Sequence, residues 1–187
     1  MHPFIYINGY PGVGKLTVAK ELCKLLPRAK LVSNHLLIDP VAAIFERTAE
    51  EYRPLRQLLR RQVLKSIATS TSTRDVTWVF TDQQSSSALG SSASRDYQEA
   101  AAVRASPFIL IILHCELNEN MKRVAGGDRG NDSNTKLTDQ GILRSIRERE
   151  DIFQFHDEYE LVLEVTNMSP GEAATKIYEH IGKVLQK

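Results

Sequence analysis

The fold of this chain is decided by one stretch, Gly9-Tyr10-Pro11-Gly12-Val13-Gly14-Lys15-Leu16-Thr17. The stretch has the pattern Gly-x4-Gly-Lys, with a hydroxyl residue two places after the lysine. Glycines at these places allow consecutive backbone N–H groups to turn inward around a phosphate, and the lysine supplies a positive charge for the β- and γ-phosphates. We therefore expect the whole of residues 9–17 to bind a nucleoside triphosphate.

The residues on either side of this stretch support a phosphate-binding loop. An apolar run, Phe4-Ile5-Tyr6-Ile7, predicts a strand before it. A helical pattern follows, with apolar residues on one face at Leu16, Ala19, Leu22, Cys23 and Leu26. Strand, glycine loop and helix in this order are the context that such a loop requires, because the positive end of the helix points at the anion. The alternative, a glycine-rich turn with an exposed lysine, is disfavoured by this context.

Strands and helices alternate along the rest of the chain. We predict strands at 4–8, 29–33, 76–81, 107–114 and 160–166, and helices at 15–26, 36–47, 51–70, 93–105, 117–125, 138–153 and 170–186. The run from Pro107 to Leu113 is continuously apolar, which is typical of a parallel strand buried on both faces. The alternation predicts an α/β protein, a single domain over residues 1–187, with helices on both faces of the sheet and ligands at the carboxyl ends of the strands.

The composition disfavours several functional classes. A formal net charge of +1 argues against a nucleic-acid binder. The longest apolar run is too short to span a bilayer, and the N-terminus has neither the basic start nor the cleavage site of a signal peptide. Cys23 and Cys115 lie in apolar patterns without metal-like spacing, so we expect reduced thiols in a cytoplasmic protein. We expect no membrane partner, and either a monomer or a homodimer.

Two stretches are predicted to be loops. Residues 85–94 contain six serines, which favours a flexible loop. Residues 126–134 combine glycine with asparagine and aspartate, and basic residues flank this stretch: Arg123, Arg129 and Lys136. If residues 9–17 bind phosphates, the segment at about 123–137 is expected to be a mobile basic lid that closes over them. The alternative is an exposed loop with ordinary surface arginines.

One carboxylate is placed to serve Mg²⁺. Asp82 ends the third predicted strand, at the edge of the sheet where the phosphate-binding loop also lies. An acidic residue there can hold Mg²⁺ through water, or orient Thr17. We therefore assign the metal site to Thr17 and Asp82. The alternative for Asp82 is a turn residue at the end of the strand.

With this loop, five strands and a basic lid, the chain resembles the P-loop small-molecule kinases. Its Gly-x-Pro-Gly-x-Gly-Lys-x-Thr loop is similar to that of adenylate kinase, and its architecture resembles shikimate and gluconate kinases and the chloramphenicol phosphotransferase type. Only residues 4–26 match sharply. The resemblance implies a three-layer P-loop NTPase fold with a five-stranded parallel sheet in the order 2-3-1-4-5, an ATP site at the loop, and arginines on the lid. A looser likeness, carried by Asn34-His35-Leu36, is to uncharacterised bacterial ATPases and implies no substrate.

The resemblance also implies roles for several arginines. Arg123 and Arg129 match the lid by location and would neutralise charge on the transferred phosphoryl group. Arg144 or Arg147, on the helix after the lid, would match a second arginine group. Three further arginines share a predicted helical face on the acceptor-binding side, where they would bind an anionic acceptor or simply face solvent: Arg53, Arg56 and Arg60.

The end of the second predicted strand departs from the family. Related kinases often carry a carboxylate there that orients or deprotonates the acceptor hydroxyl. Here Asn34 or His35 takes that position, and Asp39 lies one helical turn later. His35 is a candidate base because the usual pKa of histidine lies near neutrality; Asp39 remains a second candidate, with Asn34 as an orienting group. The alternative is that Asn34 caps the next helix and His35 belongs to its first turn.

The sequence therefore predicts an ATP- and Mg²⁺-dependent phosphotransferase acting on a small soluble acceptor, such as a nucleoside, nucleotide or sugar acid. The predicted catalytic residues are Lys15, His35, Asp39, Arg123 and Arg129. A nucleotide-binding regulatory protein or slow NTPase, without a small-molecule acceptor, is the alternative. A nucleic-acid end kinase is disfavoured by the near-zero net charge.

Overall fold

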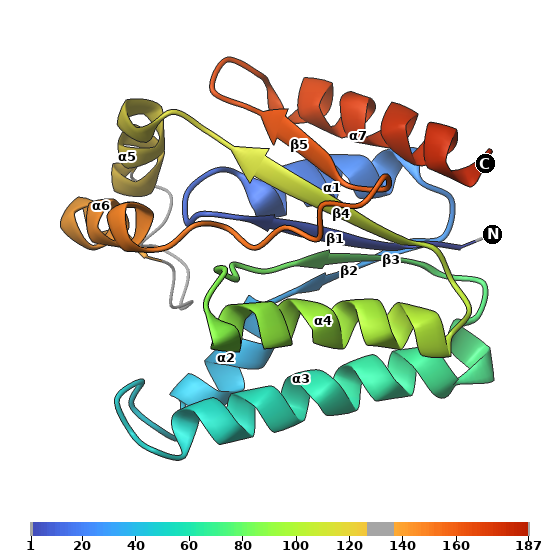
Figure 1. The fold of residues 1–187 in the computed structure, drawn as a ribbon, viewed down its shortest axis with the longest axis horizontal. Coiled ribbons are helices and arrows are strands. Elements are labelled where there is room, and N and C mark those ends of the chain that lie inside the picture. The colour runs from blue at the N-terminus through green and yellow to red at the C-terminus, as the bar shows by residue number, and fades with distance from the viewer. Residues whose placement is uncertain (1, 127–136, 187) are drawn as a thin grey trace.

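The computed structural model describes residues 2–126 and 137–186, which form three layers, a parallel sheet between two layers of helices (Figure 1). The sheet has the strand order β2-β3-β1-β4-β5. Its strands are β1 (Phe4–Gly9), β2 (Ala29–Ser33), β3 (Thr77–Thr81), β4 (Phe108–His114) and β5 (Leu161–Glu164). The α/β fold class and the strand order are thus confirmed, while the division into a single domain over 1–187 stays a prediction.

Helices cover both faces of the sheet. On one face α1 (Lys15–Leu25) packs against α7 (Pro170–Leu185), and on the other α3 (Tyr52–Thr69) packs against α4 (Ala88–Val103) (Figure 1). The short helix α2 (His35–Ala42) follows β2, and a 3₁₀ turn (Thr71–Thr73) follows α3. Helices α5 (Leu117–Ala125) and α6 (Gln140–Arg149) lie beyond the carboxyl end of β4 (Figure 1). No helix in the described ranges is long and apolar enough to cross a bilayer.

Alternate residues of the central strands enter two separate hydrophobic clusters. In β1, Ile5 and Ile7 belong to the cluster under α1 and α7, whereas Phe4 and Tyr6 belong to the cluster under α3 and α4. All four side chains are fully buried, and burial of each such side chain contributes about 1.5–3 kcal/mol to folding. Because side chains pack against β1 on both faces of the sheet, they fix the position of its carboxyl end, where the next loop begins.

The prediction of a flexible loop over residues 85–94 is wrong. Helix α4 begins at Ala88, and the Ser87 hydroxyl accepts a hydrogen bond of 3.2 Å from the amide of Gly90. Ser94 is fully buried, with its hydroxyl 3.4 Å from that of Tyr6. Serine is small and can cap a helix or hydrogen-bond inside a core, so a serine-rich composition here serves a packed helix start.

Two predicted helices end earlier than expected. Helix α2 stops at Ala42 instead of 47, and α6 stops at Arg149 instead of 153. After α6 the chain is extended and pairs with residues 84–86: Ser86 donates its amide hydrogen to the carbonyl of Asp151 at 2.8 Å, and Phe153 donates to Gln84 at 3.1 Å. These bonds require extended backbone, so they end the helical pattern that the sequence suggested.

The cap of α4 gives a stability test. Ser87→Ala removes the hydroxyl that accepts from Gly90, and we expect it to lower the free energy of unfolding by about 1 kcal/mol, the usual loss for a serine N-cap. Urea denaturation followed by circular dichroism measures this change. Ser86→Ala, one residue outside the cap position, is the matched control. An equal loss in both variants would show that the cap contributes nothing particular.

Candidate functional site

The loop between β1 and α1 folds around the ammonium group of Lys15. Lys15 Nζ donates to the carbonyl oxygens of Gly9 and Tyr10 at 2.7 and 2.8 Å. Gly14 precedes the first turn of α1 with φ of 100°, a left-handed conformation that favours glycine. Within the loop Gly9, Tyr10 and Val13 are buried. The other residues of the predicted nucleotide-binding stretch line the neighbouring cavity: Pro11, Gly12, Gly14, Lys15, Leu16 and Thr17.

Helix α5 supports the loop from its outer side. The fully buried Asn120 donates from Nδ2 to the carbonyl oxygen of Pro11 at 2.8 Å. Gly12 has φ of 87°, and a Cβ built there would lie 2.4 Å from Cγ2 of Val124 and 2.6 Å from Nδ2 of Asn120. Real Cβ atoms do not approach so closely, so this contact between loop and helix requires glycine.

Arg147 holds the same loop through a second set of contacts. Its Nη1 donates to Oδ1 of Asn120 at 2.9 Å, and its guanidinium lies 4.7 Å from the centre of the Tyr10 ring. The Tyr10 hydroxyl donates to the carbonyl of Glu150 at 2.6 Å. The resemblance placed Arg144 or Arg147 in a second arginine group, but neither lines the cavity beside the loop. Arg147 contributes instead by fixing the loop through Asn120 and the ring of Tyr10.

Asn8 ties the start of the loop to two distant segments. Its side chain is fully buried, and its Nδ2 donates to the carbonyls of Gln84 at 2.9 Å and Phe153 at 3.4 Å. Its Oδ1 accepts from the amides of Gly9 and Gln84, both at 2.9 Å. The loop, the chain after β3 and the chain after α6 are therefore joined at one side chain.

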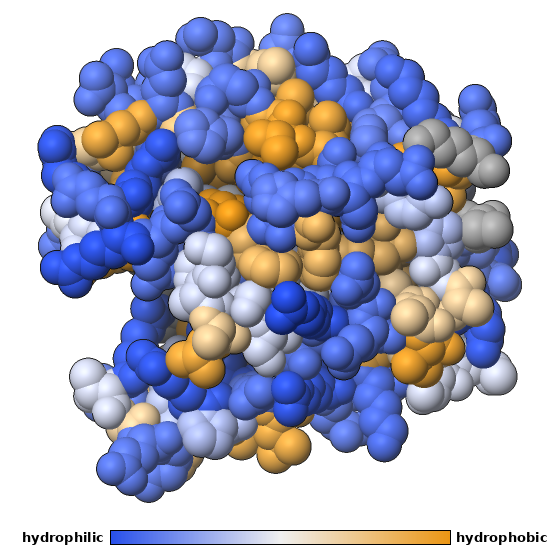
Figure 2. All heavy atoms as spheres, viewed as in Figure 1, coloured by the Kyte–Doolittle hydropathy of each residue, from blue (hydrophilic) through white to orange (hydrophobic). Residues whose placement is uncertain are grey.

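A large cavity of about 820 Å³ opens beside the loop and extends past the ends of β2 and β3 to α3. Figure 2 shows the hollow between the α5–α6 pair and α2, bordered mostly by hydrophilic residues. Among the described residues that line it, Asp82 is the only acidic one, whereas four are basic: Lys15, Arg47, Arg56 and Arg123. This excess of positive charge suits anionic ligands.

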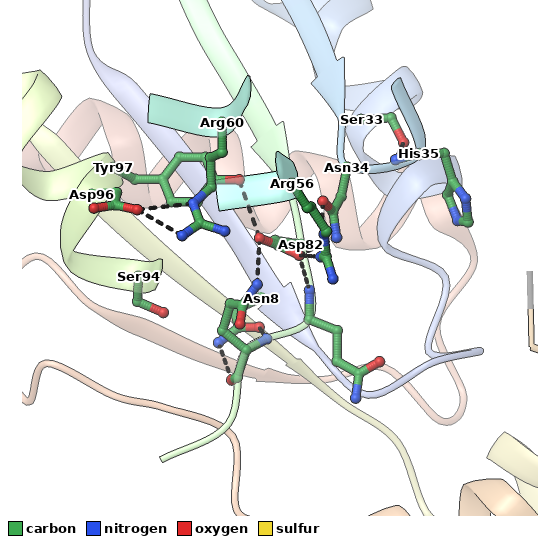
Figure 3. A network of polar contacts seen from close by, with 12 residues as sticks. Asn8, Ser33, Asn34, His35, Arg56, Arg60, Asp82, Ser94, Asp96 and Tyr97 are labelled. Atoms are coloured by element: carbon green, nitrogen blue, oxygen red, sulfur yellow. Dashed lines mark hydrogen bonds and ion pairs between the residues drawn. The ribbon is translucent and has the colours of Figure 1, made fainter. Parts of the chain in front are cut away.

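Asp82 lies at the centre of a polar network on the cavity wall (Figure 3). Only 1% of its surface is exposed. Its oxygens accept from the side chains of Asn34, Gln84 and Tyr97 and from the backbone amide of Gln83. Burial, and next the negative charge of Asp82, raise the pKa of Tyr97 well above its usual value, so this hydroxyl stays protonated and donates.

The fold family implies Mg²⁺, and the two predicted metal residues fit it unequally. Thr17 lines the cavity, two residues after Lys15. Asp82 also lines the cavity, but four hydrogen-bond donors already occupy its two oxygens. Over residues 2–126 and 137–186 no three His, Cys, Asp or Glu side chains form a cluster that could hold a metal ion. Of the two predicted metal residues, Asp82 is therefore the poorer fit, because its oxygens are already hydrogen-bonded.

At the end of β2, the structure separates the three predicted acceptor-side residues. Asn34 occupies the N-cap position of α2 but makes no capping hydrogen bond. Its amide instead donates to Asp82 and accepts from Nη2 of Arg56 at 3.2 Å (Figure 3). His35 lines the cavity, and its Nδ1 lies 3.8 Å from Oδ1 of Asp39, which does not line it. His35 is thus the candidate base that faces the cavity, with Asp39 as its neighbour.

Of the three arginines predicted to share a face of α3, only Arg56 lines the cavity. Arg60 is buried and pairs with Asp96, at 3.0 Å from Nε and 2.7 Å from Nη2, and Arg53 is exposed. Sequence analysis missed Arg47, which lines the cavity from the connection between α2 and α3. The sequence placed Arg47 at the end of a predicted helix over 36–47, but the helix stops at Ala42, so Arg47 lies in the connection that follows it.

The two predicted lid arginines differ in what the structure describes. Arg123 is held by Glu119, at 3.0 Å from its Nε, and by the carbonyls of Val165 and Thr166, at 3.0 and 2.8 Å from its Nη2. It still lines the main cavity. Arg129 and most of the predicted lid at about 123–137 lie outside the described residues, so that assignment stays a prediction from the sequence.

A second cavity of about 310 Å³ lies on the other side of the loop. It is bounded by the connection between β5 and α7, where Val165, Met168 and Pro170 line it. It shares four lining residues with the main cavity: Gly12, Gly14, Thr17 and Arg123. A ligand at the loop therefore has space on both sides, polar toward β2 and more apolar toward α7.

Solved structures share this architecture over nearly the whole chain. A gluconokinase from Sinorhizobium meliloti 1021 aligns with a TM-score of 0.66 and 13% identity, over 97% of this chain and 93% of that one. A shikimate kinase from Acinetobacter baumannii, in complex with shikimate, aligns with a TM-score of 0.63 and 20% identity, over 100% and 97%. An APS kinase from Mycobacterium tuberculosis, in complex with AMPPNP and APS, aligns with a TM-score of 0.62 and 15% identity, over 97% and 98%.

No protein-family model and no curated protein sequence matches the chain. At these low identities the structural likeness shows the fold, which is the one found in P-loop small-molecule kinases, as the resemblance in the loop predicted. What those kinases phosphorylate is a property of their own acceptor sites. The function of this chain has to be argued from its own cavity.

The contact between Gly12 and α5 gives a test of the loop. Gly12→Ala brings a methyl group against Val124 and Asn120, and overpacking of this kind costs about 1–3 kcal/mol unless the loop moves. We expect weaker ATP binding by calorimetry, with a native circular dichroism spectrum. Gly171→Ala is the control, because a Cβ there meets no atom within 4 Å. Unchanged ATP affinity in Gly12→Ala would contradict a nucleotide site that depends on this loop geometry.

Proposed function

We propose that this protein is an ATP- and Mg²⁺-dependent phosphotransferase that moves the γ-phosphoryl group to a small soluble acceptor bearing a negative charge. The observation that carries the proposal is the single cavity that joins the phosphate-binding loop to His35, Arg47 and Arg56. A kinase needs both substrates in one space, because the acceptor oxygen must reach the γ-phosphorus in line with the bond that breaks.

The nucleotide end of the cavity is built from the loop. The phosphates of ATP occupy the loop, and Lys15 exchanges its carbonyl contacts with Gly9 and Tyr10 for the β- and γ-phosphate oxygens. The base extends into the second cavity, against Met168. Thr17 would hold Mg²⁺, which when bound supplies positive charge to the phosphate oxygens. The free thiols of Cys23 and Cys115 fit a reducing compartment, so we place the protein in the cytoplasm.

The acceptor end is positively charged. Arg56 lines the cavity from α3 and Arg47 from the connection before it. The planar guanidinium group of arginine suits carboxylate and phosphate groups, which it can bind through two parallel hydrogen bonds. An acceptor with such a group would be held with its hydroxyl toward His35. The structural neighbours that act on gluconate, shikimate and APS support an acceptor of this kind.

In the transfer, the acceptor hydroxyl oxygen forms a bond to the γ-phosphorus while the bond from that phosphorus to the β–γ bridging oxygen breaks. ADP leaves with the bridging oxygen, and the hydroxyl proton passes to His35, with Asp39 beside it at 3.8 Å. Arg123 lines the cavity and would neutralise charge on the transferred group; Arg129 keeps the same role as a prediction.

The proposal is tested by acceptor-dependent release of ADP. The protein is incubated with ATP and Mg²⁺ and with gluconate, shikimate, APS or AMP in turn, and ADP release is compared with a reaction that lacks acceptor. We expect at least one anionic acceptor to raise the rate well above the background. ADP release that no acceptor changes would instead support the slow NTPase or regulatory protein that the sequence left open.

Nucleotide binding depends on one ammonium group. Lys15→Ala should remove most of the affinity for ATP, because the backbone amides of the loop cannot replace a positive charge at the phosphates. Isothermal calorimetry measures the affinity, and circular dichroism checks the fold. Lys24→Ala, in the exposed ion pair with Glu21, is the matched control. Parent-like ATP affinity in Lys15→Ala would contradict the nucleotide site.

Acceptor activation distinguishes the two candidate bases. His35→Ala should lower kcat/KM by about a hundredfold, the low end for acid–base groups, and flatten the loss of activity at low pH. The loss arises because a histidine base works only when neutral, and protonation removes it as the pH falls. Asp39→Asn should have a smaller effect, since Asp39 does not line the cavity. The reverse order of effects would make Asp39 the base.

A further inference from the structure

The environment of Asp82 decides which part of the reaction this carboxylate serves. One oxygen, Oδ1, accepts from Nδ2 of Asn34 and from the amide of Gln83 at 2.7 Å. The other, Oδ2, accepts from Nε2 of Gln84 at 2.8 Å and from the hydroxyl of Tyr97 at 3.1 Å. These donors come from the end of β2, the chain after β3, and α4 (Figure 3).

The carboxylate has no acceptor capacity left for a metal. An ionised carboxyl group offers about four lone-pair sites, and four donors here fill them, two at each oxygen. A direct bond to Mg²⁺, or a hydrogen bond from a water molecule bound to Mg²⁺, would have to displace one of these donors. The displaced group would be left in a site of which only 1% is exposed, and burying an unpaired donor is costly.

The same contacts connect Asp82 to the acceptor end of the cavity. Asn34 donates to Asp82 and accepts from Nη2 of Arg56, so its amide links the carboxylate to the guanidinium group. Arg56 Nη2 also lies 3.7 Å from Oδ1 of Asp82, close enough for a favourable charge interaction. Within the described residues, Nε of Arg56 is buried and has no hydrogen-bond partner. The guanidinium is therefore held on one side through Nη2, in a residue that lines the cavity.

We propose that Asp82 is a positioning residue for the acceptor, acting through Asn34 and Arg56, and is not a ligand of Mg²⁺. This inference rests on the proposed phosphotransferase function for its effect on turnover. Asp82 fixes the orientation of Arg56, and Arg56 binds the negatively charged group of the acceptor. Thr17 is then the protein residue that serves the metal.

The first measurement separates the metal from the acceptor and needs no turnover. The affinity for ATP is measured by calorimetry with and without Mg²⁺ in the parent, Asp82→Asn and Thr17→Val. The ratio of the two affinities in Asp82→Asn should stay within about twofold of the parent ratio, because this substitution removes no bond to Mg²⁺ and leaves only a weaker effect of charge through space. The ratio in Thr17→Val should fall toward one. A comparable fall in Asp82→Asn would overturn the proposal.

The second measurement follows Arg56 directly. Phenylglyoxal modifies accessible guanidinium groups, and mass spectrometry of the Arg56 peptide gives the rate at this position. Arg56 in Asp82→Asn should react faster than Arg56 in the parent. The NH₂ group of the introduced asparagine must face one of the four groups that donate to Asp82, and this repulsion between donors loosens the network. Asp75→Asn is the matched control: it removes a carboxylate from the exposed ion pair with Arg28. An unchanged Arg56 rate in Asp82→Asn would overturn the proposal.

A second variant covers the case in which Asp82→Asn does not fold. Asn34→Ala leaves the buried carboxylate in place and removes only the link, so Arg56 should again react faster.

The kinetic test uses the acceptor that the panel identifies. Either variant should raise the KM for this acceptor about tenfold or more, as expected when a bond to a charged group is lost. The KM for ATP should change little. A parent-like acceptor KM in both variants would contradict the proposal. Failure of the proposed function looks different, since the parent itself would then show no acceptor-dependent release of ADP.

Discussion

The site depends on a backbone turn that only glycine can make at two positions. Gly12 and Gly14 take positive φ angles, and Gly12 also lies so close to α5 that a Cβ has no space. This turn directs the chain from the end of β1 into α1 and brings the loop carbonyls around Lys15. Both cavities meet at these same glycines, so the space for a ligand exists because the backbone can pass there without side chains.

The sheet explains why distant residues meet at this turn. All the strands are parallel, so the ends of β1, β2 and β3 lie at one edge of the sheet, and Asn8, Asn34 and Asp82 are brought together there. Two hydrophobic clusters fix the strands from both faces. At this edge of the sheet, the buried carboxylate of Asp82 accepts hydrogen bonds at both oxygens, whereas basic side chains line the cavity.

Features that depend on neighbouring residues could be predicted from the sequence, whereas features that depend on distant contacts could not. The turn between β1 and α1, the strand order and the position of most helices follow from local patterns and from the resemblance, and they are confirmed, whereas nucleotide binding by the turn stays a prediction. The pairing of residues 84–86 with 151–153 ended α6 early, and no local pattern shows such a contact. Likewise, the four donors of Asp82 include Asn34 and Tyr97, which lie 48 and 15 positions away along the chain. The role of Arg147 could not be predicted for the same reason, because its partner Asn120 lies 27 positions away along the chain.

The side chain of Asn8 has a consequence for the order in which the protein matures. During synthesis, Asn8 is translated 145 residues before Phe153, whose carbonyl is one of its acceptors. The acceptor for the Tyr10 hydroxyl, Glu150, also emerges late. Until then Asn8 Nδ2 has only the carbonyl of Gln84 as an acceptor, and the Tyr10 hydroxyl lacks the acceptor it has in the fold. The glycine loop is therefore translated well before the segment that completes its hydrogen bonds, and it reaches its final form only when residues 150–153 have packed against it.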